Sequence, residues 1–177
     1  MVIESTRFPG LFILDNAPFQ DSRGSFHKFY NKNDLSAVKF IPKESFYTVS
    51  AKSVIRGMHF LTGAYACSKL ITITAGRVLD VILDLRHSSP TFSQYVSFEL
   101  SRDGINSILI PEGCAHGFLS LEANSTLIYM SSKVYSPSHD TGVRFDSFGF
   151  NWDISHPIIS GRDMKLPTFN VEKTYFK

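Results

Sequence analysis

Hydrophobic and polar positions alternate with a period of two along most of the chain, a pattern that predicts β-strands. The alternation is clearest at residues 69–75 and 79–85, on either side of Gly76, where a turn is expected. In the second run, positions 79, 81, 83 and 85 would share one face, opposite Asp80, Ile82 and Asp84. Shorter runs predict further strands at 10–16, 26–30, 46–50, 94–100, 107–110, 118–121 and 125–134.

Turn-forming residues separate these runs and indicate how the strands are connected. Gly, Pro, Asp, Asn and Ser cluster at 16–18, 21–24, 88–91, 102–104 and 111–113. Short helices are expected at 32–36, with Asn33 or Asp34 as the cap, and near 160–165, within a loop-rich tail that starts at Tyr135. Short strands at such intervals predict an all-β Greek-key or jelly-roll fold, and no internal boundary divides residues 1–177 into more than one domain.

The composition is that of an ordinary globular protein, with 43% hydrophobic and 19% charged residues. A net charge of +2 argues against a nonspecific nucleic-acid-binding surface. Because no apolar run approaches the roughly 18 residues that span a bilayer, and no secretion signal is visible, we expect no membrane partner. Cys67 and Cys114 are expected to be reduced thiols of a cytoplasmic protein.

One stretch combines charged and titratable side chains beside a predicted strand. In residues 56–60, strand alternation would place Arg56 with Met58 on one face and Gly57 with His59 on the other, and Lys69 opens the next strand. A base and a cation that converge on one cavity suit the removal of a proton next to a carbonyl, because the cation stabilises the enolate oxygen. The alternative is a basic edge strand with a packed histidine.

Metal and nucleophilic chemistry are poorly supported by the sequence. A metal-binding jelly roll would carry a His-x-His pair followed by a carboxylate, whereas residues 58–60 hold only His59, and His116 would be a second, isolated ligand. Neither cysteine lies in a recognisable catalytic motif. We therefore expect no metal and no cofactor.

Acid–base chemistry needs an orienting carboxylate and a proton donor. A carboxylate would fix the tautomer of His59, and the sequence leaves four candidates open: Asp80, Asp84, Asp140 and Asp163. Tyr129 lies in an apolar strand and could return a proton from the opposite side of a cavity, or could be a core aromatic. An anion pocket could further draw on Arg23, Arg56, Lys69 and His116.

Several stretches together resemble the dTDP-4-dehydrorhamnose 3,5-epimerase family of nucleotide-sugar enzymes. They are DSRGSF (21–26), SVIRGMHF (53–60), SKLITITAGRVLDVILDLRHSSPTF (68–92), IPEGCAHGF (110–118), VYSPSHDTGVRFD (134–146) and ISGRD (159–163), in order along nearly the whole chain. The resemblance implies a metal-independent, cupin-type jelly-roll β-barrel, a homodimer, and a nucleotide-diphosphate 4-keto sugar as substrate. It also implies a role in deoxysugar and O-antigen polysaccharide biosynthesis.

The resemblance also implies roles for individual residues. His59 matches the base, Asp163 its orienting carboxylate, Tyr129 the proton donor on the opposite face, and Lys69 the cation that stabilises the enolate. The implied substrate-binding positions are Arg23, Phe26, Lys28, Glu44, Phe46, Arg56, His116, Asp140 and Arg162. The arm that carries Arg23 often reaches into the partner's site in this family.

The chain departs from the family at positions expected to line the substrate pocket. Lys28 stands in place of a common Glu, Glu44 and Phe46 in place of Gln and Asn, and Leu61 in place of Gln. The residues implied to be catalytic are all present, while those implied to recognise the substrate differ. The nucleotide base, the sugar and the number of inverted centres therefore stay open. A ketoisomerase, or a cupin that binds a sugar nucleotide without turnover, is the alternative.

Overall fold

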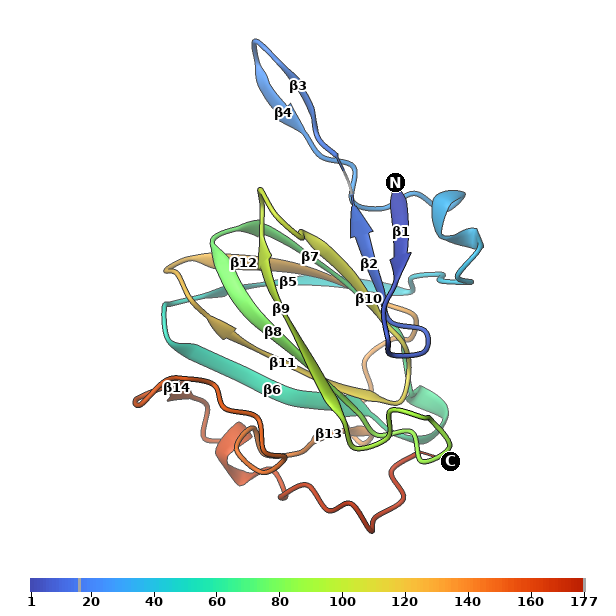
Figure 1. Cartoon of the computed structure of the whole chain (residues 1–177), viewed down its shortest axis with the longest axis vertical. Coiled ribbons are helices and arrows are strands. Elements are labelled where there is room, and N and C mark those ends of the chain that lie inside the picture. Colours follow the sequence, from blue (N-terminus) through green and yellow to red (C-terminus); the bar gives the residue numbers. More distant parts are fainter. Residues whose placement is uncertain (16, 177) are drawn as a thin grey trace.

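The computed structural model describes residues 1–15 and 17–176, and β-strands dominate it (Figure 1). One six-stranded sheet has the order β1-β2-β10-β7-β12-β5. The other has the path β13-β6-β11-β8-β9, with β14 parallel to β6, and β3 and β4 form a separate hairpin. The strands are β1 (Val2–Ser5), β2 (Phe12–Asp15), β3 (Phe19–Asp21), β4 (Gly24–Phe26), β5 (Glu44–Ser50), β6 (Val54–Leu61), β7 (Lys69–Ala75), β8 (Arg77–Asp84), β9 (Tyr95–Ser101), β10 (Ser107–Ile110), β11 (Cys114–Ser120), β12 (Ser125–Ser131), β13 (Asp140–Gly142) and β14 (Ile158–Ile159).

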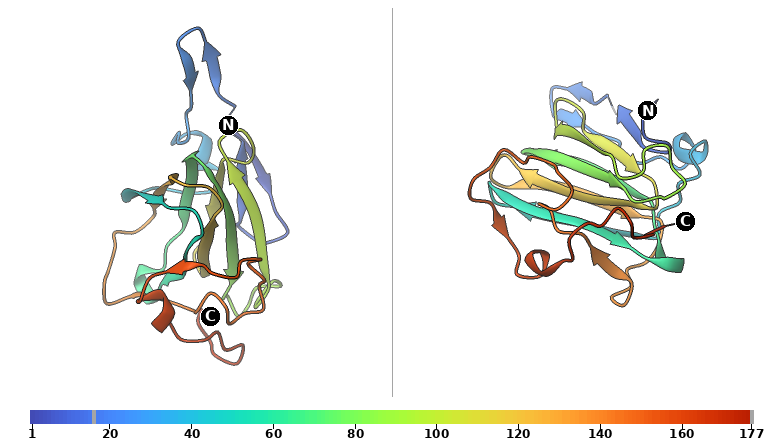
Figure 2. Two further views of the ribbon diagram at one scale, coloured as in Figure 1. Left: turned by 90° about the vertical axis from the view of Figure 1, so that its left-hand side faces the viewer. Right: turned by 60° about the horizontal axis from the view of Figure 1, so that its bottom comes forward.

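The two sheets face one another across an apolar core, which confirms the predicted all-β jelly roll. In the described residues they remain two sheets and do not close into one hydrogen-bonded ring. Ile71 and Ile73 of β7 and Ile82 of β8 are fully or almost fully buried between the sheets. The opposite face of β8 is also apolar, because the C-terminal segment packs Trp152 and its neighbours over Leu83 (Figure 2). The predicted alternation of β8 is therefore confirmed.

Most of the predicted strands are present, with bounds shifted by a few residues. The strand predicted at 107–110 is β10, and those at 94–100 and 125–134 are β9 and β12. The strand at 118–121 is the second half of β11, and the one at 10–16 is β2, although Asn16 lies outside the described residues. The short helices are single 3-10 turns, η1 (Asp34–Ser36) and η3 (Asp163–Lys165). The elements that were not predicted are η2 (Gly63–Tyr65), β1, β3 and, within the tail expected to be loop-rich, β13 and β14.

The strand predicted at 26–30 is wrong. The strand β4 ends at Phe26, and residues 27–30 belong to no strand. β4 pairs only with β3, and the hairpin projects beyond the sheets (Figure 1). Without a sheet to pack against, Phe19 and Phe26 are 65% and 63% exposed, and the apolar pattern of this stretch does not extend the strand.

The predicted faces of residues 56–59 are also wrong, because β6 contains a bulge. His59 pairs with His116 and Arg56 with Phe118, so three steps along β6 oppose two steps along β11. The extra residue shifts the alternation. Arg56 and His59 consequently share one cavity, while Met58 is fully buried in the apolar cluster beneath the C-terminal segment.

Glycine is required at the centre of this bulge. Gly57 has a φ of +129°, and a Cβ atom at this position would lie 2.5 Å from the Cα of Gly117 on β11. Only a residue without a side chain allows β6 and β11 to approach so closely. The Gly57-x-His59 spacing in the sequence thus encodes the bulge that turns the imidazole into the cavity.

Candidate active site

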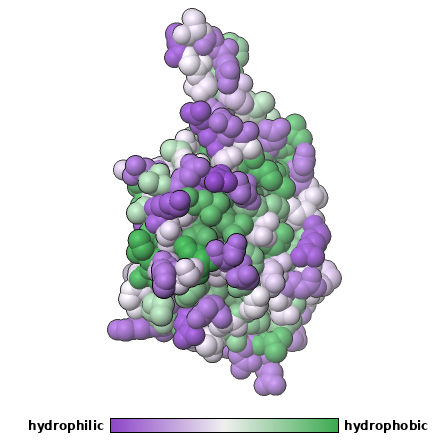
Figure 3. Space-filling view, turned by 60° about the vertical axis from the view of Figure 1, so that its left-hand side comes forward, coloured by the Kyte–Doolittle hydropathy of each residue, from purple (hydrophilic) through white to green (hydrophobic). Residues whose placement is uncertain are grey.

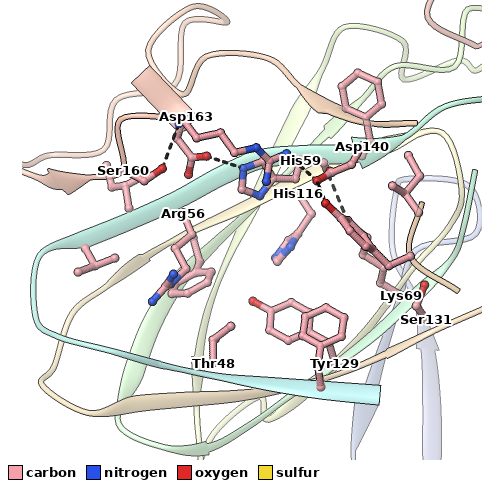
Figure 4. Close-up of a pocket in the computed structure, with 18 of the residues that line it drawn as sticks. Thr48, Arg56, His59, Lys69, His116, Tyr129, Ser131, Asp140, Ser160 and Asp163 are labelled. Carbon is pink, nitrogen blue, oxygen red and sulfur yellow. Dashed lines mark hydrogen bonds and ion pairs between the residues drawn. The ribbon is translucent and has the colours of Figure 1, made fainter. Parts of the chain in front are cut away.

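A cavity of about 550 Å³ lies between the two sheets. On the face shown in Figure 3, a hollow of apolar residues is bordered by hydrophilic ones below the projecting hairpin. The cavity is lined by all four residues predicted to be catalytic and by six predicted to bind substrate (Figure 4). These are His59, Lys69, Tyr129 and Asp163, together with Glu44, Phe46, Arg56, His116, Asp140 and Arg162.

His59 and Asp163 form a hydrogen-bonded pair on one wall of the cavity. The bulge of β6 presents the imidazole, and η3 presents the carboxylate from more than a hundred residues further along the chain. His59 Nε2 lies 2.8 Å from Asp163 Oδ1. Because a carboxylate only accepts, Nε2 carries the hydrogen, and Nδ1 is left as the basic nitrogen. Of the four carboxylates that the sequence left open, the structure places Asp163 against His59.

The local hydrogen bonds keep Asp163 ionised. Burial of this carboxyl, which is 4% exposed, would raise its pKa, but hydrogen bonds from His59 and from the backbone N–H of Gly57 hold the pKa below its ordinary value. Its own backbone N–H donates to Ser160 Oγ at 3.0 Å and fixes the start of η3. An anion bonded in this way fixes the orientation and the tautomer of the imidazole.

Tyr129 lies on the opposite wall, on β12 of the other sheet. Its ring stacks on Phe46, the residue directly paired with it on β5, with ring centroids 4.8 Å apart, and it meets His116 edge-on at 6.1 Å. Burial and the negative charge of Asp80 raise the pKa of Tyr129, so the phenol is protonated at neutral pH. A base and an acid therefore face one cavity from two sheets.

Lys69 supplies a cation between these walls. It begins β7, and its Nζ donates to the backbone carbonyl of His59 at 3.4 Å. Burial lowers the pKa of Lys69, an effect opposed by Cys67 and Asp140. An ammonium held in such a site can stabilise negative charge on an enolate oxygen.

Asp80 and Asp84 have partners other than His59. Asp80, which is fully buried, pairs with His116 Nε2 at 2.8 Å. Asp84 accepts hydrogen bonds from Arg86 and from the hydroxyls of Ser89 and Thr91 outside the cavity.

The rim of the cavity carries a second polar network, which includes Asp140, the last of the four carboxylates. Asp140 Oδ2 accepts from Arg162 at 2.7 Å and from the phenol of Tyr135 at 3.0 Å. Glu44 accepts from the backbone N–H of Tyr135 at 2.8 Å. These contacts order the rim that a ligand has to pass.

Three predicted substrate-binding residues do not line the cavity. Arg23 and Phe26 belong to the projecting hairpin, and Lys28 follows it. Arg23 pairs with Asp21 at 2.6 Å across the hairpin turn. In this single chain these three side chains therefore lie away from the other predicted site residues.

Several cavity residues were not predicted, chiefly Thr48, Ser131, Tyr135 and Ser160. The alternation of β5 could have indicated Thr48, because Glu44 and Phe46 are on the same face. Ser160 lies three residues before Asp163, as expected for a residue that caps a turn. No group of three or more His, Cys, Asp and Glu in the described part of the chain is placed to hold a metal ion.

The described residues include no helix long and apolar enough to cross a membrane.

Comparison with known proteins identifies the family. The model of the dTDP-4-dehydrorhamnose 3,5-epimerase family matches residues 5–171. The enzyme of that name from Salmonella typhimurium is 35% identical over 173 residues, which cover 94% of each chain. A crystal structure of the Bacillus anthracis enzyme, with TDP and PPi bound, has a TM-score of 0.89 and 35% identity over 95% of this chain and 99% of that one.

Two further solved structures have the same fold. The dTDP-4-dehydrorhamnose 3,5-epimerase from Sulfolobus tokodaii has a TM-score of 0.90 and 33% identity over 100% of both chains. NovW, a 4-keto-6-deoxy sugar epimerase from the novobiocin biosynthetic gene cluster of Streptomyces spheroides, has a TM-score of 0.89 and 28% identity over 95% of this chain and 87% of that one. With a family match over nearly its whole length, the chain belongs to the dTDP-4-dehydrorhamnose 3,5-epimerase family.

Proposed function

We propose that the chain epimerises a nucleotide-linked 4-keto-6-deoxy sugar at C3, C5 or both. The observation that carries this proposal is the His59–Asp163 pair on one wall of the cavity, which faces the protonated Tyr129 on the other wall. Base and acid on opposite walls suit inversion of a carbon, in which a proton leaves from one face of the ring and another arrives on the opposite face.

The proposed step needs no cofactor. His59 removes the proton from the carbon next to the 4-keto group, and the electrons of that C–H bond move onto the carbonyl oxygen, where Lys69 stabilises the enolate. Tyr129 then donates its proton to the same carbon from the other side. Both groups return to their starting states by proton exchange with solvent after product leaves.

The pocket differs from the implied family pattern on both sheets, at Glu44 and Phe46 of β5 and at Leu61 of β6. Phe46 and Leu61 replace amides, and Glu44 replaces a third amide with a carboxylate. When a polar group of the substrate loses a hydrogen-bond partner in the pocket, binding is weakened by about 1–3 kcal/mol per contact. We therefore propose that the preferred sugar or nucleotide differs from that of amide-bearing relatives. The TDP bound in the Bacillus anthracis structure supports a nucleoside diphosphate as the part of the substrate that does not react.

The decisive experiment is hydrogen exchange in D₂O with a panel of dTDP-, CDP-, GDP- and UDP-linked 4-keto-6-deoxy sugars. We expect deuterium at C3 or C5 of at least one of them and an inverted centre in the product, measured by NMR and mass spectrometry. His59→Asn should abolish both. A relocated ketone would indicate ketoisomerisation, and tight binding without any exchange would indicate a non-catalytic cupin; either result refutes the epimerase.

We also propose a cytoplasmic homodimer in which the hairpin of β3 and β4 contacts a second copy. The exposed rings of Phe19 and Phe26 support this, because large apolar side chains rarely remain in solvent on an isolated hairpin. The buried free thiols of Cys67 and Cys114 fit a reducing compartment. Light scattering should give twice the mass of one chain, and Phe19→Ser with Phe26→Ser should shift it toward the monomer. A wild-type mass equal to that of one chain refutes the dimer.

A further inference from the structure

Two buried side-chain atoms in the described part of the chain lack a hydrogen-bond partner, and both lie near Tyr129. They are Thr48 Oγ1 and Asp80 Oδ1. Leaving a buried polar atom unpaired is destabilising, so such atoms call for an explanation. Asp80 is an acceptor that already pairs with His116 through its other oxygen. The hydroxyl of Thr48 makes no well-formed hydrogen bond, but it lies against the Tyr129 phenol and acts to lower the pKa of that phenol.

Strand geometry directs Thr48 toward the phenol. Glu44, Phe46 and Thr48 alternate along β5 and all line the cavity. Phe46 is the direct cross-strand partner of Tyr129, so Thr48 lies diagonally across from it, within reach of its ring. In Figure 4 the Thr48 side chain lies beside the hydroxyl end of Tyr129.

The phenol has few other groups that could support a negative charge. Phe46 covers one face of the ring and His116 meets it edge-on. Of the charged groups that face it, Asp80 on β8 opposes ionisation of the phenol and Arg56 on β6 favours it. The Arg56 guanidinium, however, already donates to Ser50 Oγ at 3.0 Å and to the Val49 carbonyl at 3.3 Å.

We propose that Thr48 is a positioning residue whose hydroxyl donates a hydrogen bond to the oxygen of Tyr129 when that phenol gives up its proton. The inference rests on the proposed function. The Tyr129 O–H bond breaks and a C–H bond forms on the sugar, while the negative charge passes from the enolate to the phenolate oxygen. Thr48 keeps its own proton throughout. Its hydroxyl makes no well-formed hydrogen bond in the resting site, and its bond to the phenol oxygen strengthens when that oxygen becomes negative.

Thr48→Val tests this role, because it removes the hydroxyl and keeps the β-branched shape. A hydrogen bond to a charged group corresponds to roughly a 10- to 100-fold effect, so we expect the rate of inversion to fall by that factor. Removal of the proton by His59 does not involve Thr48. Deuterium exchange without inversion should therefore persist, and the ratio of exchange to inversion should rise.

Two comparisons separate this role from a structural one. Thr48→Ser restores the hydroxyl and should recover most of the inversion. Thr48→Val should also unfold at about the same temperature as the wild type, since the hydroxyl that is lost makes no well-formed hydrogen bond in the resting site.

Inversion by Thr48→Val within twofold of the wild type overturns the proposal, as does a parallel fall of exchange and inversion or a Thr48→Ser variant no better than Thr48→Val. A wild-type chain that exchanges no hydrogen in any 4-keto nucleotide sugar refutes the proposed function itself. The two failures are thereby distinguished.

Discussion

Replacing Asp163 with asparagine removes the charge that orients and activates His59 while it preserves the size of the side chain. Asp163 Oδ1 lies 2.8 Å from His59 Nε2, and Oδ2 accepts from the Gly57 N–H at 3.2 Å. A charge-assisted hydrogen bond contributes about 1.5–3 kcal/mol, which corresponds to roughly a 10- to 100-fold change in rate. An asparagine that turns its NH₂ toward the ring would in addition favour the wrong tautomer. We therefore expect kcat to fall by about 10²-fold or more.

The assay is deuterium exchange of a 4-keto nucleotide sugar, followed by NMR at saturating substrate. The matched control is Asp146→Asn, which removes a carboxylate from a surface pair with Arg144 at 2.7 Å and should leave kcat unchanged. A kcat for Asp163→Asn within threefold of the wild type would show that the carboxylate does not act through His59.

The same carboxylate also gives a test by pH. Because the pKa of Asp163 in the folded chain is below its ordinary value of 3.8, the ionised form stabilises the fold at pH above that value. This stabilisation is lost as the pH falls through the lower folded-state pKa. We therefore expect the free energy of unfolding, measured with urea between pH 3 and about pH 6, to fall less on acidification in Asp163→Asn than in the wild type. An equal fall in the free energy of unfolding in both proteins would contradict a lowered pKa of Asp163 in the folded chain.

Three other predictions follow from the cavity and its walls. Lys69→Met should lower kcat by about 10²–10³-fold in steady-state assays, because the enolate loses its cation, and a change below threefold would exclude that role. Gly57→Ala should lower the free energy of unfolding in urea by at least about 1–3 kcal/mol, because of the positive φ and the contact with Gly117, whereas a neutral effect would contradict the bulge geometry. Burial raises the pKa of Cys114 to about 12, so iodoacetamide at pH 8 should leave it unmodified, by mass spectrometry, until urea is added; labelling of the native chain would contradict this burial.

The sequence predicted the jelly roll well because strands that bury one face more than the other show a period of two. β12 shows this most clearly, since buried and partly exposed residues alternate along it, whereas β8 is buried on both faces, between the sheets and beneath the C-terminal segment. The end of the hairpin was predicted poorly because Phe19 and Phe26 pair only with each other and stay largely exposed. The family resemblance implied the residue roles, including that of Asp163, which the residues alone had left among four carboxylates.

The sequence by itself therefore determined most of the strands and the family, because these depend on local pattern and on motifs that are continuous along the chain. Only the tertiary structure decided which groups meet. The bulge in β6 brings Arg56 and His59 to one side, and pairing between distant strands sets Thr48 and Phe46 beside Tyr129. Register between strands depends on packing across the whole sheet, so the composition of the cavity is a property of the folded chain.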